Sequence, residues 1–308
     1  MPLDEARMFH ININCSDLGR SRAFYCDGVG LVEGTRTKPN GVQSGVAFGL
    51  DVAQWDAWIL VGDHGFAGGA IDLLEWQTPS PVGEPPASLA QAGFARVGIS
   101  VPNIETAMAR VQSSGGTVWS DVVEHVEGTT TVRLVMTSDP DGTVVELFEG
   151  GGPRLMFVGI TCSDVERSVK FYSELGFAEV LRVHSEPQNG GHLRLEGPVV
   201  MDEVLMSAPG GGEVMLMLGS FRSRASASPN AADAVPVGVR RPANALGMWR
   251  TALLVPDLDG ACAVLAALGV EMVSDPVSMA MGPGLPELRF VCAFGPDGEV
   301  VELIESPT

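Results

Sequence analysis

With 308 residues, 45% of them hydrophobic, the chain is long enough for about two domains that each bury a core. Its formal net charge of −19 disfavours nucleic acid and anionic membrane surfaces as partners, because both require clusters of lysine and arginine. The five scattered cysteines form no Cys-x-x-Cys pair, and no apolar run approaches the ~20 residues that span a bilayer. These features favour a cytoplasmic protein without a disulfide framework or a structural zinc site.

One pattern occurs four times along the chain. In its first copy, "MFHININCSDLGRSRAFY" from Met8, an alternating strand leads to an aspartate and then to an amphipathic segment. The copies that follow are "ARVGISVPNIETAMARV", "MFVGITCSDVERSVKFY" and "WRTALLVPDLDGACAVL". Aspartate and asparagine are preferred helix N-caps, so each copy predicts a strand followed by a helix that begins after Asp17, Asn103, Asp164 or Asp257.

A further strand closes each copy. The four closing segments are "AIDLLEW", "SDPDGTVVELFE", "EVMLML" and "FGPDGEVVELIE", and Pro-Asp-Gly in two of them predicts a tight turn. The sequence therefore predicts four βαβββ modules near residues 6–78, 92–150, 153–220 and 246–306. Since only "GGGP" separates the second module from the third, we expect two compact domains at 1–150 and 151–308, each made of two consecutive modules.

The combination of these motifs resembles the vicinal oxygen chelate superfamily, which includes glyoxalase I, bleomycin-resistance proteins and extradiol dioxygenases. The motifs are Ser-Asp-Leu, a helix ending in Phe-Tyr, Leu-Gly-Phe at 175–177, and Asp-Pro-Asp-Gly before a Glu-Leu strand. The resemblance implies an α+β fold whose modules pair into two domains, each a cupped, mostly antiparallel sheet with flanking helices. It also implies a metal site in the cup, with ligands from the first and last strands of each module, where the metal acts as a Lewis acid.

In residues 1–150 the resemblance maps these ligand positions to His10, Asp72, Arg96 and Glu146. One interpretation is a divalent metal (Zn, Mn, Fe or Ni) bound by His10, Asp72 and Glu146, with Arg96 turned away. We favour a second interpretation, in which Arg96 replaces the charge of the metal, because a guanidinium would repel a divalent cation. His10 beside Asp72 would then act as an acid–base pair, with Arg96 and Glu146 completing a metal-free catalytic site. A third interpretation is that the four residues only form hydrogen bonds and ion pairs with one another, without a role in catalysis.

In residues 151–308 the same positions carry Phe157, Arg250 and Glu302, and an apolar residue at or near Met215 in the third module. Arginine has no lone pair to donate, so we expect Arg250 and Glu302 to form an ion pair. This disfavours an extradiol dioxygenase, whose iron is implied to need two histidines and a glutamate in this cup. The candidate substrate-binding residues of this cup are Phe157, Arg250, Glu302, Trp249 and His192, with His192 on an expected strand, "HLRLEG".

The leading functional hypothesis is a glyoxalase-like enzyme of lyase or isomerase type that needs no cofactor. It would transfer a proton, or eliminate a group, on a small organic substrate with neighbouring oxygens. The alternative is a non-catalytic protein that binds and sequesters a small, antibiotic-like molecule, as implied by the resemblance to bleomycin-resistance proteins. In either case the expected partner is a small molecule, with no nucleic acid and no membrane, and the protein is a monomer or a homodimer.

Overall fold

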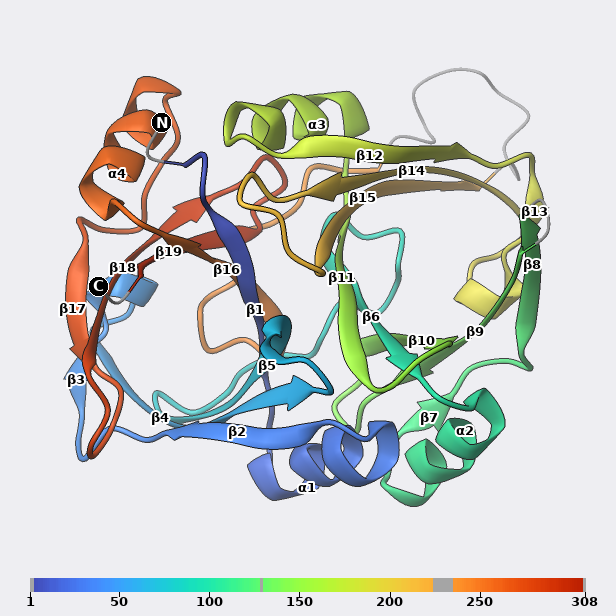
Figure 1. Cartoon of the computed structure of the whole chain (residues 1–308), viewed down its shortest axis with the longest axis horizontal. Helices are drawn as coiled ribbons and strands as arrows, with labels where there is room; N and C mark the ends of the chain where they lie inside the picture. The colour runs from blue at the N-terminus through green and yellow to red at the C-terminus, as the bar shows by residue number, and fades with distance from the viewer. Residues whose placement is uncertain (1–2, 128–129, 224–234, 307–308) are drawn as a thin grey trace.

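The computed structural model describes residues 3–127, 130–223 and 235–306, and it contains the four predicted βαβββ modules (Figure 1). The first module comprises β1 (Arg7–Asn14), α1 (Leu18–Ala23), the π-helix η1 (Phe24–Val29), β2 (Val32–Thr37), β3 (Gln43–Ser44), the 3-10 helix η2 (Val46–Phe48), β4 (Val52–Gly62) and β5 (Gly65–Thr78). The second comprises β6 (Gly93–Val101), α2 (Ile104–Ser113), β7 (Thr117–Val118), β8 (Val123–Glu127), β9 (Thr130–Ser138) and β10 (Val144–Glu149).

The third and fourth modules repeat this order. The third comprises β11 (Arg154–Thr161), α3 (Val165–Glu174), β12 (Ala178–His184), β13 (Gln188–Asn189), the 3-10 helix η3 (Gly191–Leu193), β14 (Pro198–Ser207) and β15 (Met215–Ser223). The fourth comprises β16 (Gly247–Val255), α4 (Leu258–Ala267), β17 (Val277–Ala280), β18 (Glu287–Phe294) and β19 (Val300–Glu305). Among the described residues, none of the helices is long and apolar enough to cross a membrane.

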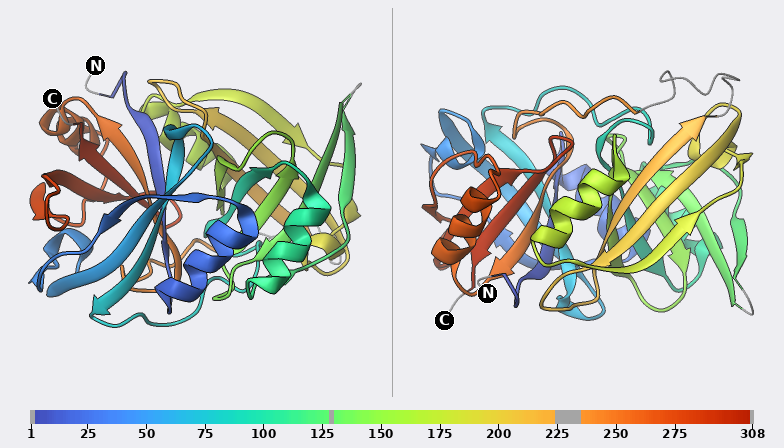
Figure 2. Two further views of the ribbon diagram at one scale, coloured as in Figure 1. Left: turned by 60° about the horizontal axis from the view of Figure 1, so that its bottom comes forward. Right: turned by 90° about the horizontal axis from the view of Figure 1, so that it is seen from above.

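Two curled sheets form the molecule, which confirms the predicted α+β fold (Figures 1 and 2). One sheet has the order β17-β18-β19-β16-β1-β5-β4-β2, with β3 on β4, and therefore joins the first module to the fourth. The other has the order β12-β14-β15-β11-β6-β10-β9-β7, with β13 on β14 and β8 on β9, and joins the second module to the third. The expectation that residues 1–150 and 151–308 would each close one cup is therefore wrong.

The reason lies in the connections between the modules. Only residues 150–153 separate β10 from β11, and β11 then pairs antiparallel with β6, with Phe157 opposite Gly98. The second and third modules are thereby kept in one sheet. The longer connection after β5 runs instead along the segment before β16, where Val82 forms a bridge with Ala245. The first module can then pair with the distant fourth module through β1 and β16.

Within each module the first and last strands lie side by side and parallel, which places the expected site positions on one face. Asn12 of β1 is opposite Asp72 of β5, and Ala252 of β16 is opposite Glu302 of β19. Side chains two residues apart on a strand share a face. His10 therefore projects on the same side as Asn12, and Arg250 on the same side as Ala252, toward the concave surface of the sheet.

The helices cover the convex faces, and their N-termini are capped as the sequence predicts. Asp17, Asn103, Asp164 and Asp257 each accept a hydrogen bond from the backbone N–H three residues later. Beneath the first two helices, Glu75 and Glu149 accept from the backbone N–H groups of Leu18 and Ile104. One large apolar core includes residues of both sheets and of all four helices, so the two sheets form one packed unit.

Two aspartates in the Pro-Asp-Gly turns join the two sheets. Asp141, in the turn between β9 and β10, accepts hydrogen bonds from the backbone N–H of Ser16 at 2.8 Å and from its hydroxyl at 2.6 Å. Asp297 makes the equivalent contacts with Ser163, at 3.2 Å and 2.6 Å. We call these contacts the turn clamps. In each clamp the aspartate belongs to one sheet and the serine precedes a helix of the other sheet.

Replacing Asp141 by alanine should lower the free energy of unfolding by about 1–3 kcal/mol, because it removes the acceptor of two hydrogen bonds from Ser16, each typically worth about 0.5–1.5 kcal/mol. Urea unfolding of the purified variant measures this loss. Glu287→Ala is a suitable control, because Glu287 is exposed on β18 and its loss should change stability by less than about 0.5 kcal/mol. Equal stability of both variants would contradict the proposed role of the clamp.

A buried tyrosine–carboxyl pair lies behind each turn clamp. The hydroxyl of Tyr25 donates to Asp139 at 3.1 Å, and the hydroxyl of Tyr172 donates to Glu299 at 2.9 Å. Burial raises the pKa of Asp139 to about 6 and the pKa of Glu299 to about 7. Each carboxyl group thus binds its proton more tightly in the folded chain than in the unfolded chain.

The pH dependence of stability should change when Glu299 is replaced by glutamine. The wild-type contribution of Glu299 is complete below about pH 4.5 and is lost as the pH rises through the folded pKa of about 7. Since glutamine does not titrate, the variant should gain up to about 3 kcal/mol relative to the wild type between pH 4.5 and pH 8. Urea unfolding at both pH values tests this, and parallel pH profiles of the two proteins would refute it.

Candidate functional site

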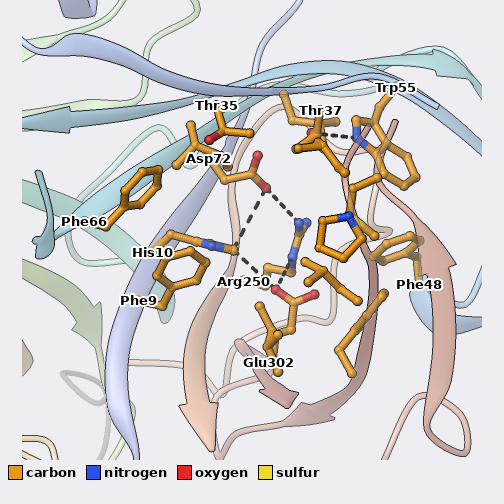
Figure 3. A pocket seen from close by; sticks show the side chains of 18 residues that line it. Phe9, His10, Thr35, Thr37, Phe48, Trp55, Phe66, Asp72, Arg250 and Glu302 are labelled. Carbon is orange, nitrogen blue, oxygen red and sulfur yellow. Dashed lines mark hydrogen bonds and ion pairs between the residues drawn. The ribbon is translucent and has the colours of Figure 1, made fainter. Parts of the chain in front are cut away.

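The concave face of the sheet of modules one and four encloses a cavity of about 350 Å³, which we call the first cup (Figure 3). Its walls are mainly apolar and aromatic and include Phe9, Phe48, Trp55, Phe66 and Phe290. Its polar floor consists of His10, Asp72, Arg250 and Glu302, all of them buried. The floor therefore lies in a largely dry environment, where electrostatic interactions are stronger than in water.

Arg250 is the centre of this floor. Its Nη2 donates to Asp72 Oδ2 at 2.7 Å and its Nε donates to Glu302 Oε2 at 2.9 Å, so the expected ion pair with Glu302 is present. Burial opposes the charge of the guanidinium, but the carboxylates of Glu302 and Asp72 outweigh it and raise the pKa of Arg250. The third nitrogen, Nη1, is buried and has no hydrogen-bond partner in the described part of the chain.

His10 lies beside both carboxylates. Its Nε2 is 3.3 Å from Glu302 Oε2 and 4.0 Å from Asp72 Oδ2, yet neither ring nitrogen has a well-aligned hydrogen bond to any described residue. Burial alone would raise the pKa of Glu302, but the charges of Arg250 and His10 prevail and lower it. Asn12 Nδ2 contacts Asp72 Oδ2 at 3.3 Å and helps to fix that carboxylate. The floor thus combines an imidazole, a guanidinium and two carboxylates.

The other sheet encloses a larger cavity of about 700 Å³, which we call the second cup. Here Arg96 Nε donates to Glu146 Oε2 at 2.7 Å, and Arg96 Nη2 donates to Glu203 Oε1 at 2.5 Å and contacts Met217 Sδ at 3.0 Å. The ring of Phe157 lies 5.4 Å from the guanidinium carbon. Burial raises the pKa of Glu146, because it outweighs the attraction of Arg96.

The structure therefore divides the expected site residues differently between the cups. His10 and Asp72 do not meet Arg96 and Glu146, which lie in the second cup with Phe157 and His192. They meet instead the two residues expected in the other site, Arg250 and Glu302. The spacing within each module correctly predicts positions that lie in a cup. The prediction of which two modules share a cup is wrong.

Two smaller expectations also need correction. Trp249 does not line the first cup but packs behind Phe48, and its indole N–H donates to the backbone carbonyl of Arg241 at 3.0 Å. His192 does line the second cup, but it lies on the 3-10 helix Gly191–Leu193 and not on an alternating strand. Asn189 and two glycines, at 190 and 191, come just before it and favour a turn over a strand only weakly, so the sequence pattern alone is ambiguous.

Sequence reasoning missed Glu203. In the second cup Met217 occupies the place that Asp72 has in the first, because Met217 is opposite Gly159 as Asp72 is opposite Asn12. Glu203, on the neighbouring strand β14, supplies the missing second carboxylate to Arg96. The acidic pair "DE" within the otherwise apolar strand segment 198–207 was the available signal, but it does not show which acid faces the cup.

The residues of the first cup, as arranged, do not fit a divalent metal. A donor set of His10, Asp72 and Glu302 would have to use Asp72 Oδ2 and Glu302 Oε2, and Arg250 already binds both of these oxygens. A divalent metal ion would have to take these oxygens as ligands while in direct contact with the guanidinium, and like charges repel strongly in a buried site. Within the described ranges, no group of three or more histidine, cysteine or acidic side chains is arranged to hold a metal ion.

Comparisons with known proteins agree with this architecture. The profile of the Glyoxalase/Bleomycin resistance protein/Dioxygenase superfamily matches residues 7–147 and 154–303. The chain belongs to this superfamily. The crystal structure of glyoxalase I from Zea mays superposes with a TM-score of 0.64 over 97% of this chain and 92% of that chain, at 17% identity. A point variant of the same enzyme gives a TM-score of 0.66 over the same shares, also at 17% identity.

A sequence relative within the superfamily comes from Arabidopsis thaliana and is named "Probable lactoylglutathione lyase, chloroplastic". The two sequences are 34% identical over 99 residues, which is 32% of this chain and 28% of the relative. The match thus covers less than a third of that protein. The superfamily and the fold are established by these comparisons, and the reaction and the substrate are treated below as proposals.

Replacing Arg250 by alanine should create affinity for divalent metals in the first cup. The change frees Asp72 Oδ2 and Glu302 Oε2 beside His10 Nε2 and removes the competing positive charge. Co²⁺ titration should then produce visible absorption bands typical of a protein-bound ion, and calorimetry should show one Zn²⁺ site.

The wild type, and a double variant that also carries His10→Ala, serve as controls for this titration and should show much weaker metal binding. If the wild type binds one equivalent of Co²⁺ as tightly as Arg250→Ala does, the guanidinium does not exclude the metal and the interpretation is wrong.

Proposed function

We propose that the first cup transfers a proton on a small organic carbonyl compound with a neighbouring hydroxyl group, without a metal, as an isomerase or a lyase would. The main support for this proposal is the environment of His10. Both of its nitrogens lack a hydrogen bond in the described chain, and it lies beside a guanidinium at the bottom of an apolar cavity. A histidine with a free nitrogen in such a place is a good general base.

The residues that line the first cup limit the size and charge of the substrate. The cavity volume of about 350 Å³ is near the lower end of the range for small-molecule sites, and aromatic side chains form much of its wall. Arg250, the only arginine or lysine among the described lining residues, is already bound by two carboxylates. The cup therefore favours a compact, uncharged and partly aromatic substrate over a conjugate with several carboxylates, such as a glutathione adduct.

The proposed reaction uses three parts of the floor. His10 Nε2 removes the proton from the carbon that bears the hydroxyl group, and the electron pair of that bond moves to the carbonyl oxygen. Arg250, through Nη1, donates a hydrogen bond to the oxygen as negative charge develops on it, while Asp72 and Glu302 hold the guanidinium in place. Return of the proton to the former carbonyl carbon, together with transfer of the hydroxyl proton to the new enolate oxygen, gives the isomer.

The superfamily membership and the partial match to a lactoylglutathione lyase support a reaction of this type. A non-catalytic protein that only sequesters its ligand is the alternative. The two can be separated experimentally, because sequestration gives binding without exchange of the substrate's carbon-bound hydrogen.

Exchange in D₂O is a direct test, since proton removal must precede every outcome of the proposed reaction. Proton NMR should show loss of the carbon-bound hydrogen from an aromatic α-hydroxyketone when the wild type is added. Replacing His10 by glutamine should slow this exchange by about 10²–10⁴-fold, the usual contribution of a general base. His184→Gln is a matched control, because His184 lies exposed on β12 outside both cups and its loss should not change the rate.

Two results would overturn the proposal. If His10→Gln exchanges the hydrogen as fast as the wild type, His10 is not the base. If a panel of α-hydroxyketones binds to the wild type with measurable heat but none of them exchanges, the protein is a binding protein.

A further inference from the structure

The floors of the two cups each hold one arginine and two carboxyl groups, but only the floor of the first cup also holds a histidine. In the first cup, Asp72 and Glu302 face two groups that can be positive, namely Arg250 and His10. In the second cup, Glu146 and Glu203 face only Arg96, because Phe157 stands where the other cup has His10. The floor of the second cup is therefore one positive charge short when both of its carboxyl groups are ionised.

Besides Arg96, no described side chain of the second cup forms an ion pair with Glu146 or Glu203. His192 lines the cup, but burial and the nearby His125 lower the pKa of His192 and favour its neutral form. His125, on β8 beside β9, also lines the cup and its charge favours ionised Glu146, but in the described chain it forms no ion pair with Glu146 or Glu203. Glu213, at the rim, adds a negative charge, and it is already paired with His64 and Arg154 outside the cup.

The walls of the second cup suit a cation that carries apolar groups. They include four methionines, among them Met215 and Met217, and three phenylalanines, among them Phe157 and Phe221. The negative face of an aromatic ring attracts a cation, and polarizable thioether sulfurs adapt to irregular apolar shapes. The cavity volume of about 700 Å³ is twice that of the first cup and lies within the range of sites for drug-sized molecules.

We propose that the second cup is a separate binding site for a lipophilic organic cation, whose positive group lies beside Glu146 and Glu203 and over the ring of Phe157. The ligand supplies the charge that His10 can supply in the first cup. This site does not depend on the reaction proposed for the first cup, since it uses none of the same side chains.

Two probes of the same shape and opposite charge test this site, tetraphenylphosphonium and tetraphenylborate. Calorimetry with the 308-residue chain should show binding of the phosphonium cation and at least about tenfold weaker binding of the borate anion, because burial amplifies the effect of charge. Equal affinity for both ions would show that the cup recognises apolar shape alone and would overturn the proposal.

Three variants then test which cup binds the phosphonium cation. Glu203→Gln keeps an acceptor for Arg96 but removes one negative charge, and should weaken phosphonium binding by about tenfold. Phe157→His introduces the imidazole of the first cup and should weaken the binding at about pH 6, where a histidine is largely protonated. Asp72→Asn alters only the floor of the first cup and should leave the affinity unchanged. Circular dichroism and thermal melting confirm that each variant is folded.

Two outcomes would refute the assignment. If Asp72→Asn weakens phosphonium binding and a folded Glu203→Gln does not, the cation binds in the first cup. If a folded Phe157→His binds the cation as tightly as the wild type at pH 6, the ligand does not occupy the position of the missing charge.

Discussion

Each cup is built around one buried arginine that binds two carboxylates. Arg250 and Arg96 enter from equivalent first strands, and Glu302 and Glu146 bind them from the parallel last strand of the same module. A buried guanidinium without partners would be very unfavourable, so these ion pairs constrain which side chains the rest of the floor can contain. In both cups the arginine binds the carboxylate oxygens that a metal ion would need as ligands.

The replacement of His10 by Phe157 gives the two cups different electrostatics on the same frame. In the first cup the imidazole and Arg250 together stabilise ionised Glu302, and its pKa falls. In the second cup burial prevails over Arg96, and the pKa of Glu146 rises. The first floor therefore holds a group that can accept a proton, whereas the second lacks such a group, and a bound ligand can supply the positive charge there.

Much of the fold could be predicted from the sequence, because it depends on local signals. The caps at Asp17 and Asn103, the alternating strands and the Pro-Asp-Gly turns are each encoded within a few residues. The partner of each module is not encoded locally. It depends on the short connection before β11 and on the contacts of Asp141 and Asp297 with the neighbouring sheet, so the site positions were found and their grouping was not.

The first module pairs with the fourth and the second with the third, and this pairing determines the order in which the two cups form during synthesis. The second cup uses strands from β6 to β15, which are continuous along the chain, and it can be completed before the C-terminal module leaves the ribosome. The first cup requires β1 to pair with β16, so that His10 lies opposite Ala252, more than two hundred residues away. Contacts this distant in sequence are slow to form, because a long loop must close first. The sheet that contains His10 is thus the last to form, and one edge of β1 stays unpaired until β16 has been synthesised.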